Sequence, residues 1–210
     1  MKICPQCRAH YPTHFYVCPQ DGKALDSVSD FPAGTVIREK YEILQKLGQG
    51  GMGTVYKARH LVFNEICAVK IVSAELTSNP DFTERFRTEA VIMRNLNHPN
   101  VVRVEDIDKT EDDRPFIVME YVEGENLREL LAKRGSLPVP EALEIARQVC
   151  SALTAAHGLN VLHRDIKPDN LLIVSLSEGN PLIKVADFGV AKIKESTVQY
   201  GLQEGVATRA

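Results

Sequence analysis

The sequence has no apolar run approaching the roughly 20 residues that a membrane-spanning helix needs, and its start, MKICPQCRAH, lacks the apolar centre of a signal peptide. It also lacks an excess of positive charge. The formal net charge is −3, so no general attraction draws the chain to nucleic acid or to an anionic membrane. Internal repeats and low-complexity tracts are missing as well. These absences argue against a nucleic-acid partner and a membrane segment in this chain, and we expect a cytoplasmic protein.

Cysteine is scarce, yet three of the five cysteines lie within the first 18 residues. In a reducing compartment, such clustering favours metal binding over a disulfide. The turn CPQC at Cys4–Cys7 can aim two sulfurs at one tetrahedral ion, and CPQDG at 18–22 repeats the turn with Asp21 where a fourth cysteine would stand. The clustering therefore predicts a metal site at the N-terminus.

The predicted zinc ligands are Cys4, Cys7, Cys18 and Asp21. His10 or His14 could take the place of Asp21, because imidazole also binds zinc. Residues 1–26 thus resemble a zinc ribbon, through which the protein could recruit a protein partner; the alternative is a disordered tail with reactive thiols. The small and polar residues that follow, with a proline and a glycine among them, predict a linker over 27–40.

A glycine-rich segment follows the linker. The β-prone stretch Tyr41–Leu47 predicts a strand, Gly48, Gly50 and Gly53 come next, and a second strand is expected over Thr54–Ala58. Glycines let a backbone pass close to phosphate oxygens and point its N–H groups at them. Taken alone, this pattern is equally typical of a plain hairpin turn.

The next strand, CAVKIV, places Lys70 between two apolar residues, and Ala68 shares its face. A helix is then expected from the capping Asn79 to about Leu96. Glu89 lies on its apolar face, where a carboxylate is costly unless it meets a cation. Lys70 is the candidate cation; the alternative is that Glu89 reaches water at the edge of the face.

The middle of the chain predicts a strand at 115–122, a helix capped by Asn126, and a long helix ending at Gly158. The long helix should bury Leu143, Ala146, Val149, Cys150, Leu153 and Ala156. We therefore expect Cys150 to be a core residue rather than a reactive one, and likewise Cys67 inside its strand.

Two later segments, HRDIKPDN at 163–170 and the DFG sequence beginning at Asp187, bring oxygen-bearing side chains together. Asp165, Asn170 and Asp187 are the set that phosphoryl transfer needs. One carboxylate orients the attacking hydroxyl and accepts its proton, while an amide and a second carboxylate suit Mg²⁺, which prefers oxygen ligands. A nearby lysine such as Lys167 would neutralise charge on the phosphoryl group.

With these motifs in this order, the chain from Tyr41 to about Lys194 resembles the eukaryotic-like protein kinases, most closely their bacterial members. The resemblance implies an α+β, bilobal fold, with an antiparallel β lobe over 41–122 and an incomplete helical lobe over 123–210. It also implies ATP-dependent phosphorylation of serine or threonine hydroxyls on proteins. Lys167, two residues after Asp165, matches the serine/threonine pattern.

The resemblance also implies residue roles. Asp165 is the catalytic base, Asn170 and Asp187 hold Mg²⁺, and Lys70 pairs with Glu89 to anchor the ATP phosphates. ATP contacts are implied for the glycine loop and the pocket around adenine: Leu47, Gly48, Gln49, Gly50, Gly51, Met52, Gly53, Thr54, Val55, Ala68, Lys70, Met119, Glu120, Val122 and Leu172.

Beyond the DFG motif the resemblance weakens, since no Ala-Pro-Glu follows Gly189. Arg164 resembles the arginine that pairs with an activation-loop phosphate, and Ser196, Thr197 and Thr208 are the candidate acceptors. We expect a partial kinase whose long helix exposes apolar surface, with weak or no activity. The alternative function is an inactive ATP-binding or scaffold fragment.

Overall fold

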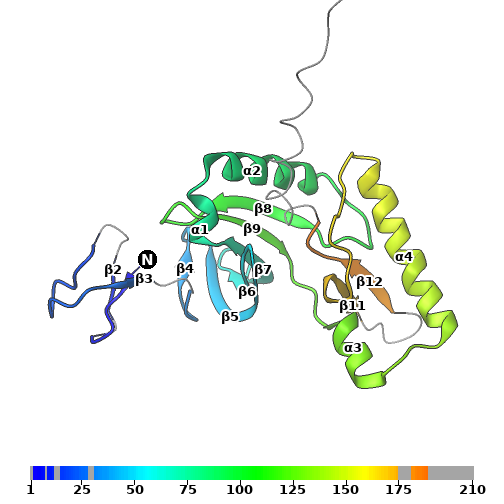
Figure 1. Ribbon diagram of the computed structural model, residues 1–210, viewed down its shortest axis with the longest axis horizontal. Helices are drawn as coiled ribbons and strands as arrows, with labels where there is room; N and C mark the ends of the chain where they lie inside the picture. The colour runs from blue at the N-terminus through cyan, green and yellow to red at the C-terminus, as the bar shows by residue number, and fades with distance from the viewer. Residues whose placement is uncertain (1, 8, 12–14, 28–30, 175–180, 189–210) are drawn as a thin grey trace, which may run out of the picture. The chain divides into compact units, whose positions relative to one another are not determined.

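The computed structural model describes residues 2–7, 9–11, 15–27, 31–174 and 181–188 (Figure 1). The chain divides into two compact units. The first unit comprises Met1–Asn79 and Asp106–Tyr121, and the second comprises Pro80–Glu105 and Val122–Ala210. Among the described helices, none combines the length and apolar character needed to cross a membrane.

The N-terminal module, residues 2–27, is a small part of the first unit. Its three strands are β1 (Lys2–Ile3), β2 (His10–Tyr11) and β3 (Asp26–Ser27), with β1 antiparallel to both others. Cys4, Cys18 and Leu25 are its buried apolar residues, and Tyr11 packs against them. With strands of two residues each, the described part of the module contains little regular secondary structure.

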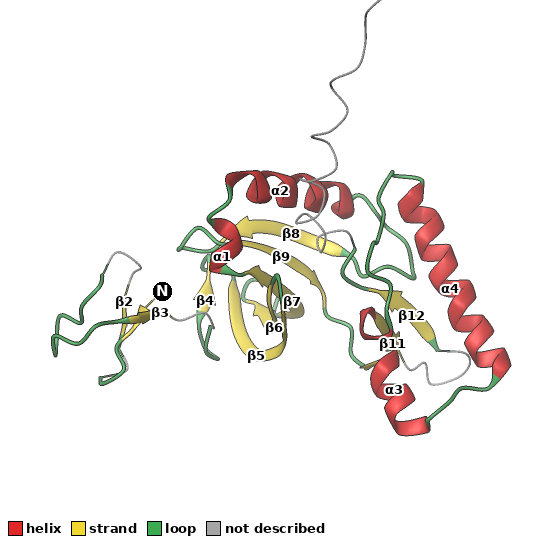
Figure 2. Ribbon diagram, viewed as in Figure 1, coloured by secondary structure: helices red, strands yellow, loops and turns green. Residues whose placement is uncertain are grey.

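A six-stranded sheet forms the rest of the first unit (Figure 2). Its strands are β4 (Val36–Ile37), β5 (Tyr41–Gly50), β6 (Gly53–His60), β7 (Glu65–Val72), β8 (Val104–Lys109) and β9 (Pro115–Glu120), in the order β4-β5-β6-β7-β9-β8. The pairs from β4 to β7 and the β7–β9 pair are antiparallel. The short helix α1 (Ala74–Thr77) follows β7. The strands predicted from the glycine loop, CAVKIV and residues 115–122 are therefore confirmed.

Part of the segment expected to be a linker packs with this sheet. Phe31 and Ile37 are buried in its core, the Phe31 N–H donates to the Tyr56 hydroxyl at 3.0 Å, and β4 pairs with β5. Residues 31–40 are thus not a free connection. Small and polar residues surround Phe31 and Ile37, so the hydropathy of the segment did not predict that these two side chains are buried.

The second unit combines helices with a three-stranded sheet. The helices are α2 (Pro80–Arg94), α3 (Leu127–Arg134), α4 (Val139–His157) and the 3₁₀ turn η1 (Pro168–Asn170). The strands are β10 (Glu125–Asn126), β11 (Leu171–Val174) and β12 (Leu182–Val185), in the order β10-β11-β12. Asn126 forms the expected cap: its side chain accepts from the Glu129 N–H, and the Glu129 carboxylate accepts from the Asn126 N–H.

The buried face of α4, which packs against β12, differs from the expected one. Leu143, Ala146 and Cys150 are exposed, so the predicted burial of Cys150 was wrong, whereas Val149 and Ala156 are buried as expected. The line that faces inward is Ile145, Gln148, Val149, Ala152 and Ala156. Gln148 explains the error. This polar residue is buried because its side-chain oxygen accepts from the Ile183 N–H of β12. Its low hydropathy is typical of a surface position, so the hydropathy pattern did not predict which face of the helix is buried.

Candidate active site

His163 fixes the start of the HRDIKPDN segment, which follows α4. Its side chain is 2% exposed, with Nε2 at 2.8 Å from the Ala186 carbonyl and Nδ1 at 3.2 Å from the Asp165 backbone N–H. A carbonyl only accepts, so Nε2 carries the proton and Nδ1 accepts from Asp165. Burial lowers the pKa of His163, which keeps the ring neutral. One side chain therefore ties the Asp165 backbone to the residue that precedes Asp187.

The carboxylate of Asp165 is held by its two neighbours in the motif. Lys167 Nζ donates to Oδ2 at 2.7 Å, and Asn170 Nδ2 donates to the same oxygen at 3.2 Å and to the Asp165 carbonyl at 2.8 Å. The hydrogen bond from Lys167 lowers the pKa of Asp165, and Asp165 in turn raises the pKa of Lys167. At neutral pH the site thus presents an ionised carboxylate and a charged amine.

Asn170 is buried and connects the catalytic segment to the strand that leads to Asp187. The Ala186 N–H donates to the Asn170 carbonyl at 2.9 Å, immediately after β12 ends at Val185. Because the Asn170 amide nitrogen donates to Asp165, the amide oxygen on its other branch is the atom that suits a metal. Asp187 follows with a φ of 61°, in the left-handed region that non-glycine residues seldom adopt.

Two residues of this site were missed by the sequence analysis. Phe188 is buried, and its ring centroid lies 4.6 Å from that of His163, the other missed residue. The signal was present in the sequence as the His of HRDIKPDN and the Phe of DFG. Neither side chain carries the reacting oxygens, so an argument based on reaction chemistry alone passes over them.

Glu89 lies on the inner face of α2, as predicted, beside the buried Phe86 and Met93. Its Oε2 is buried, and within the described residues it has no hydrogen-bond partner. Burial raises the pKa of Glu89, while the charges of Arg164 and Arg85 oppose that rise. A buried carboxylate oxygen without a donor favours a cationic partner.

In the first unit, the sheet register brings four of the predicted ATP residues onto one face. In β7, Lys70 stands opposite Val55 of β6, and Ala68 stands opposite Met119 of β9. Directly opposed residues and residues two apart share a face, so these four side chains project together. Glu120, by contrast, stands opposite Cys67, which is buried as expected. Lys70 itself is buried, with 9% of its surface exposed.

The glycine loop joins β5 to β6, and its last pair is Gly50 with Gly53. Gly53 has a φ of 153°, and a Cβ there would lie 2.0 Å from the Ile71 carbonyl oxygen. At Gly48 and Gly50 nothing lies within 4 Å of such a Cβ. The other predicted loop residues lie in the same turn and its flanking strands: Leu47, Gln49, Gly51, Met52 and Thr54.

Some predicted relations join residues of different units. Lys70 belongs to the first unit and Glu89 to the second, and Val122 and Leu172 of the predicted pocket are half-buried residues of the second unit. The Lys70–Glu89 pair and the complete ATP pocket therefore stay predictions. Arg164 is exposed with a φ of 62°. The candidate phosphate acceptors, Ser196, Thr197 and Thr208, lie outside the described residues.

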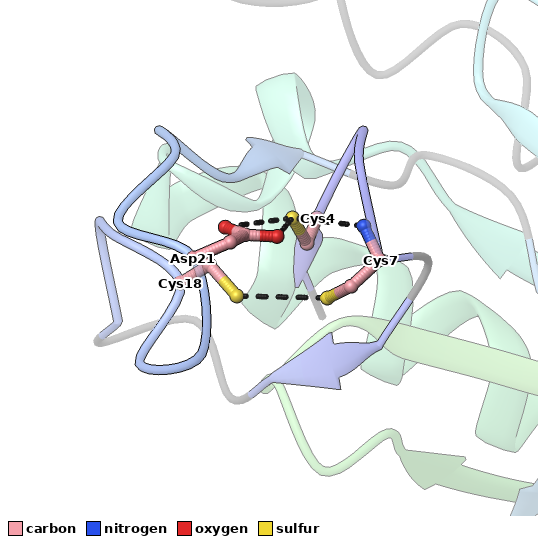
Figure 3. A group of neighbouring side chains, drawn as sticks. All are labelled: Cys4, Cys7, Cys18 and Asp21. Carbon is pink, nitrogen blue, oxygen red and sulfur yellow. Dashed lines mark hydrogen bonds between the residues drawn. The ribbon is translucent and has the colours of Figure 1, made fainter.

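The N-terminal cysteines and Asp21 converge (Figure 3). Their ligand atoms lie within 4.8 Å of one another. Burial raises the pKa of the Cys4 thiol to about 11, and the hydrogen bond from Cys4 lowers the pKa of Asp21 to about 2. His14 and the side chain of His10 lie outside what the structure describes.

A family model described as the protein kinase domain matches residues 41–210. The chain belongs to the protein kinase family. This confirms the predicted fold class, in which an antiparallel sheet precedes a helical lobe, and it confirms the resemblance on which the residue roles depend.

Three of the relatives that the chain resembles are bacterial serine/threonine-protein kinases. The chain is 44% identical over 164 residues to a "Probable serine/threonine-protein kinase" of Clostridium perfringens, covering 78% of this chain and 23% of that protein. It is 43% identical to serine/threonine-protein kinase PrkC of Bacillus subtilis, covering 78% and 24%. It is 39% identical to PknB of Mycobacterium leprae, covering 77% and 26%. The chain therefore spans about a quarter of the length of these relatives.

Solved structures show the same likeness. The kinase domain of PknI from Mycobacterium tuberculosis superposes with a TM-score of 0.68 at 33% identity, covering 77% of this chain and 64% of that one.

Proposed function

We propose that the kinase domain transfers the terminal phosphoryl group of ATP to serine or threonine hydroxyls of proteins. The observation that carries this proposal is the arrangement around Asp165: an ionised carboxylate held by Lys167 and Asn170, and joined through Ala186 to the strand that ends before Asp187. Kinase catalysis consists largely of positioning and charge stabilisation, and this arrangement offers both.

Each residue has a role in the proposal. Asp165 orients the substrate hydroxyl and accepts its proton; because its pKa is low, it does so only as the hydroxyl oxygen bonds to the terminal phosphorus of ATP and the bond to ADP breaks. Lys167 places positive charge beside the phosphoryl group that moves. Asn170 and Asp187 supply the amide and carboxylate oxygens that suit Mg²⁺, and the ion would neutralise the charge of the triphosphate.

ATP would be held by the residues of the first unit that share a sheet face. Ala68 leaves room for a flat base, and Lys70 pairs with the phosphates. Glu89 supplies the carboxylate that orients Lys70, and its buried oxygen, which lacks a partner among the described residues, supports that role. The glycine loop would place backbone N–H groups over the phosphates, with Val122 and Leu172 completing the adenine pocket.

The test is transfer of labelled phosphate from Mg-ATP to a basic protein substrate. Asp165→Asn keeps the shape of the side chain and removes the base, so we expect transfer to fall by about 10²- to 10⁴-fold. Equal transfer by both proteins would reject the enzymatic proposal. Binding of ATP without transfer by either protein would favour the second candidate, an ATP-binding scaffold.

The proposal also covers the N-terminal module, to which it assigns a zinc ion held by Cys4, Cys7, Cys18 and Asp21. Tyr16 is 74% exposed and Val17 is also exposed, so we propose that a protein partner contacts them and that the complex forms in the cytoplasm. Replacing both with serine should abolish partner capture without changing phosphotransfer. Unchanged capture would reject this contact.

A further inference from the structure

We infer that the N-terminal module is folded around its metal ion, with Asp21 as the structural counterpart of the second cysteine of a CPQC turn. The inference rests on the zinc ion proposed above and is independent of phosphotransfer. It concerns which residue is the fourth ligand and what the ion does for the module.

The two turns of the module share one backbone geometry. The Cys4 N–H donates to the Ala9 carbonyl at 3.0 Å, and the Cys18 N–H donates to the Lys23 carbonyl at 2.7 Å, so each turn closes five residues after its first cysteine. Each turn offers a second ligand three residues after the first. Cys7 is that residue in one turn, and Asp21 takes the same place in the other.

The distances between the donor atoms suit a tetrahedral ion. Two sulfurs at about 2.3 Å from a tetrahedral zinc ion would lie about 3.8 Å apart, and a sulfur and an oxygen slightly closer. The Cys7 and Cys18 sulfurs are 3.6 Å apart, and the Cys4 sulfur lies 3.0 and 3.4 Å from the two Asp21 oxygens (Figure 3). Three sulfurs and one carboxylate favour zinc among divalent ions.

Hydrogen-bond donors contact three of the four ligands, as suits an anionic cluster. The Cys7 N–H donates to the Cys4 sulfur at 3.4 Å, and the Lys23 N–H donates to Asp21 Oδ1 at 3.1 Å. The Tyr11 hydroxyl lies 3.2 Å from the Cys18 sulfur and would donate to its thiolate. Tyr11 is therefore a positioning residue, which orients a ligand without binding the ion itself.

The metal ion would also stabilise the fold of the module, which has almost no hydrophobic core. Three apolar residues are buried in the described part of the module, and two of them, Cys4 and Cys18, are ligands. Leu25 and the partly buried Tyr11 remain, which is too little apolar surface to hold three two-residue strands together. Zinc binding would therefore supply the folding free energy of the module, as it does in other small metal-held domains.

The first experiment measures metal and thiols in the full 210-residue chain. We expect about one zinc ion per chain, the stoichiometry of a single four-ligand site. The module thiols should react with a thiol reagent only after a chelator is added, while the exposed Cys150 reacts in both conditions and serves as an internal reference. A chain without zinc, or with Cys7 and Cys18 joined as a disulfide, would overturn both the inference and the proposed zinc ion.

The second experiment identifies the fourth ligand with cobalt as a spectroscopic probe. Asp21→Asn should weaken cobalt binding by more than tenfold, and Asp21→Cys should restore it with stronger thiolate-to-metal charge-transfer absorption. The matched control is Asp113→Asn, at an exposed acid in a turn of the kinase domain, which should change nothing. If Asp21→Asn binds cobalt normally and His10→Ala or His14→Ala does not, a histidine is the fourth ligand and the assignment of Asp21 fails.

Tyr11→Phe tests the positioning role. Loss of a partner that orients a ligand weakens metal affinity by roughly 10- to 100-fold, so we expect a change in that range with the charge-transfer bands retained. Unchanged affinity would show that Tyr11 only packs against the module.

Hydrogen exchange separates zinc binding from metal-dependent folding. Removing the metal from the full chain should raise amide exchange throughout residues 2–27 and leave β6 and β7 unchanged. If the chain binds one zinc ion and its removal leaves exchange in the module unchanged, the inference fails while the proposed zinc ion stands. None of these outcomes depends on phosphotransfer.

Discussion

At the scale of single residues, the short bond between Lys167 and Asp165 makes the lysine a direct neighbour of the proposed catalytic base. We expect Lys167→Met to lower phosphotransfer by about 10²- to 10³-fold, as loss of one stabilising charge does in other active sites. The side chain is exposed, so thermal unfolding should be almost unchanged. Steady-state kinetics of transfer from Mg-ATP would measure the effect.

The matched control is Lys109→Met, which also removes an exposed lysine paired with an aspartate, in the first unit. It should leave the rate within experimental error. An equal loss of rate in both variants would mean that the effect of Lys167 comes from net charge rather than from its place beside Asp165.

Gly53 is the one glycine of the loop whose identity the backbone demands. Gly53→Ala should lower the free energy of unfolding by about 1–3 kcal/mol, because the new Cβ would meet the Ile71 carbonyl at an unfavourable φ. Gly50→Ala, where a Cβ meets open space, should change it by about 0.5 kcal/mol or less. Urea unfolding of the two variants would measure the difference, and equal stabilities would contradict the structure at this turn.

The sequence indicated candidate reacting groups more directly than the contacts that hold them. Asp165, Asn170 and Asp187 were proposed because phosphoryl transfer needs oxygens of this kind, and their roles stay predictions. The burial of His163 and the hydrogen bond of its Nε2 depend on Ala186, 23 positions farther along the chain, lying beside it. Likewise, the spacing of the glycines indicated a loop, but only the fold shows which of them approaches another strand.

At the scale of elements, α4 shows how a polar residue can belong to a core. The Gln148 side chain accepts from the Ile183 N–H and the Asn100 amide, and it donates to the Pro181 carbonyl and to Glu144. These bonds offset the cost of burying an amide. Hydropathy along the helix cannot reveal such partners, so the face predicted to be buried included residues that are exposed in the structure.

Glu144 on the same helix gives a pH-dependent prediction. Hydrogen bonds from Arg147 and Gln148 lower its pKa from 4.5 to about 2. A depressed pKa contributes stability that is fully present above pH 4.5 and is lost as the pH falls toward 2. Glu144→Gln should therefore be less stable than the native chain at pH 7, and the difference should shrink as the pH falls through this window.

Urea unfolding of both proteins at several pH values would measure this difference, in which the other titrating groups cancel. The pair is exposed, so the effect should be small and should weaken with salt. A difference that stays constant from pH 7 to pH 2 would show that Glu144 acts through packing rather than through charge.

At the scale of the whole molecule, the first unit is assembled from two stretches of chain. β9, from the later stretch, pairs with β7, so residues 106–121 complete a sheet that begins before α2. The sequence identified β9 as a strand from its composition alone. It could not give the strand order, because pairing between distant strands depends on register and packing rather than on local pattern.

The outward face of α4 leads to a prediction about self-association. Val139 and Leu143 are 70% and 64% exposed, one helical turn apart, with Ala146 and Cys150 exposed farther along. Burying one such side chain against another copy contributes about 1.5–3 kcal/mol. Leu143→Glu should therefore weaken self-association of the 210-residue chain by roughly 10- to 100-fold without lowering its melting temperature.

Sedimentation at rising protein concentration, with Cys150 kept reduced, would measure this weakening. Val91→Glu is the matched control, since it places the same charge at an exposed apolar residue of another helix, α2. If both variants weaken association equally, added negative charge is the cause. If only Leu143→Glu does, the chain associates through the apolar face of α4, because that substitution alone places a charge between Val139 and Ala146.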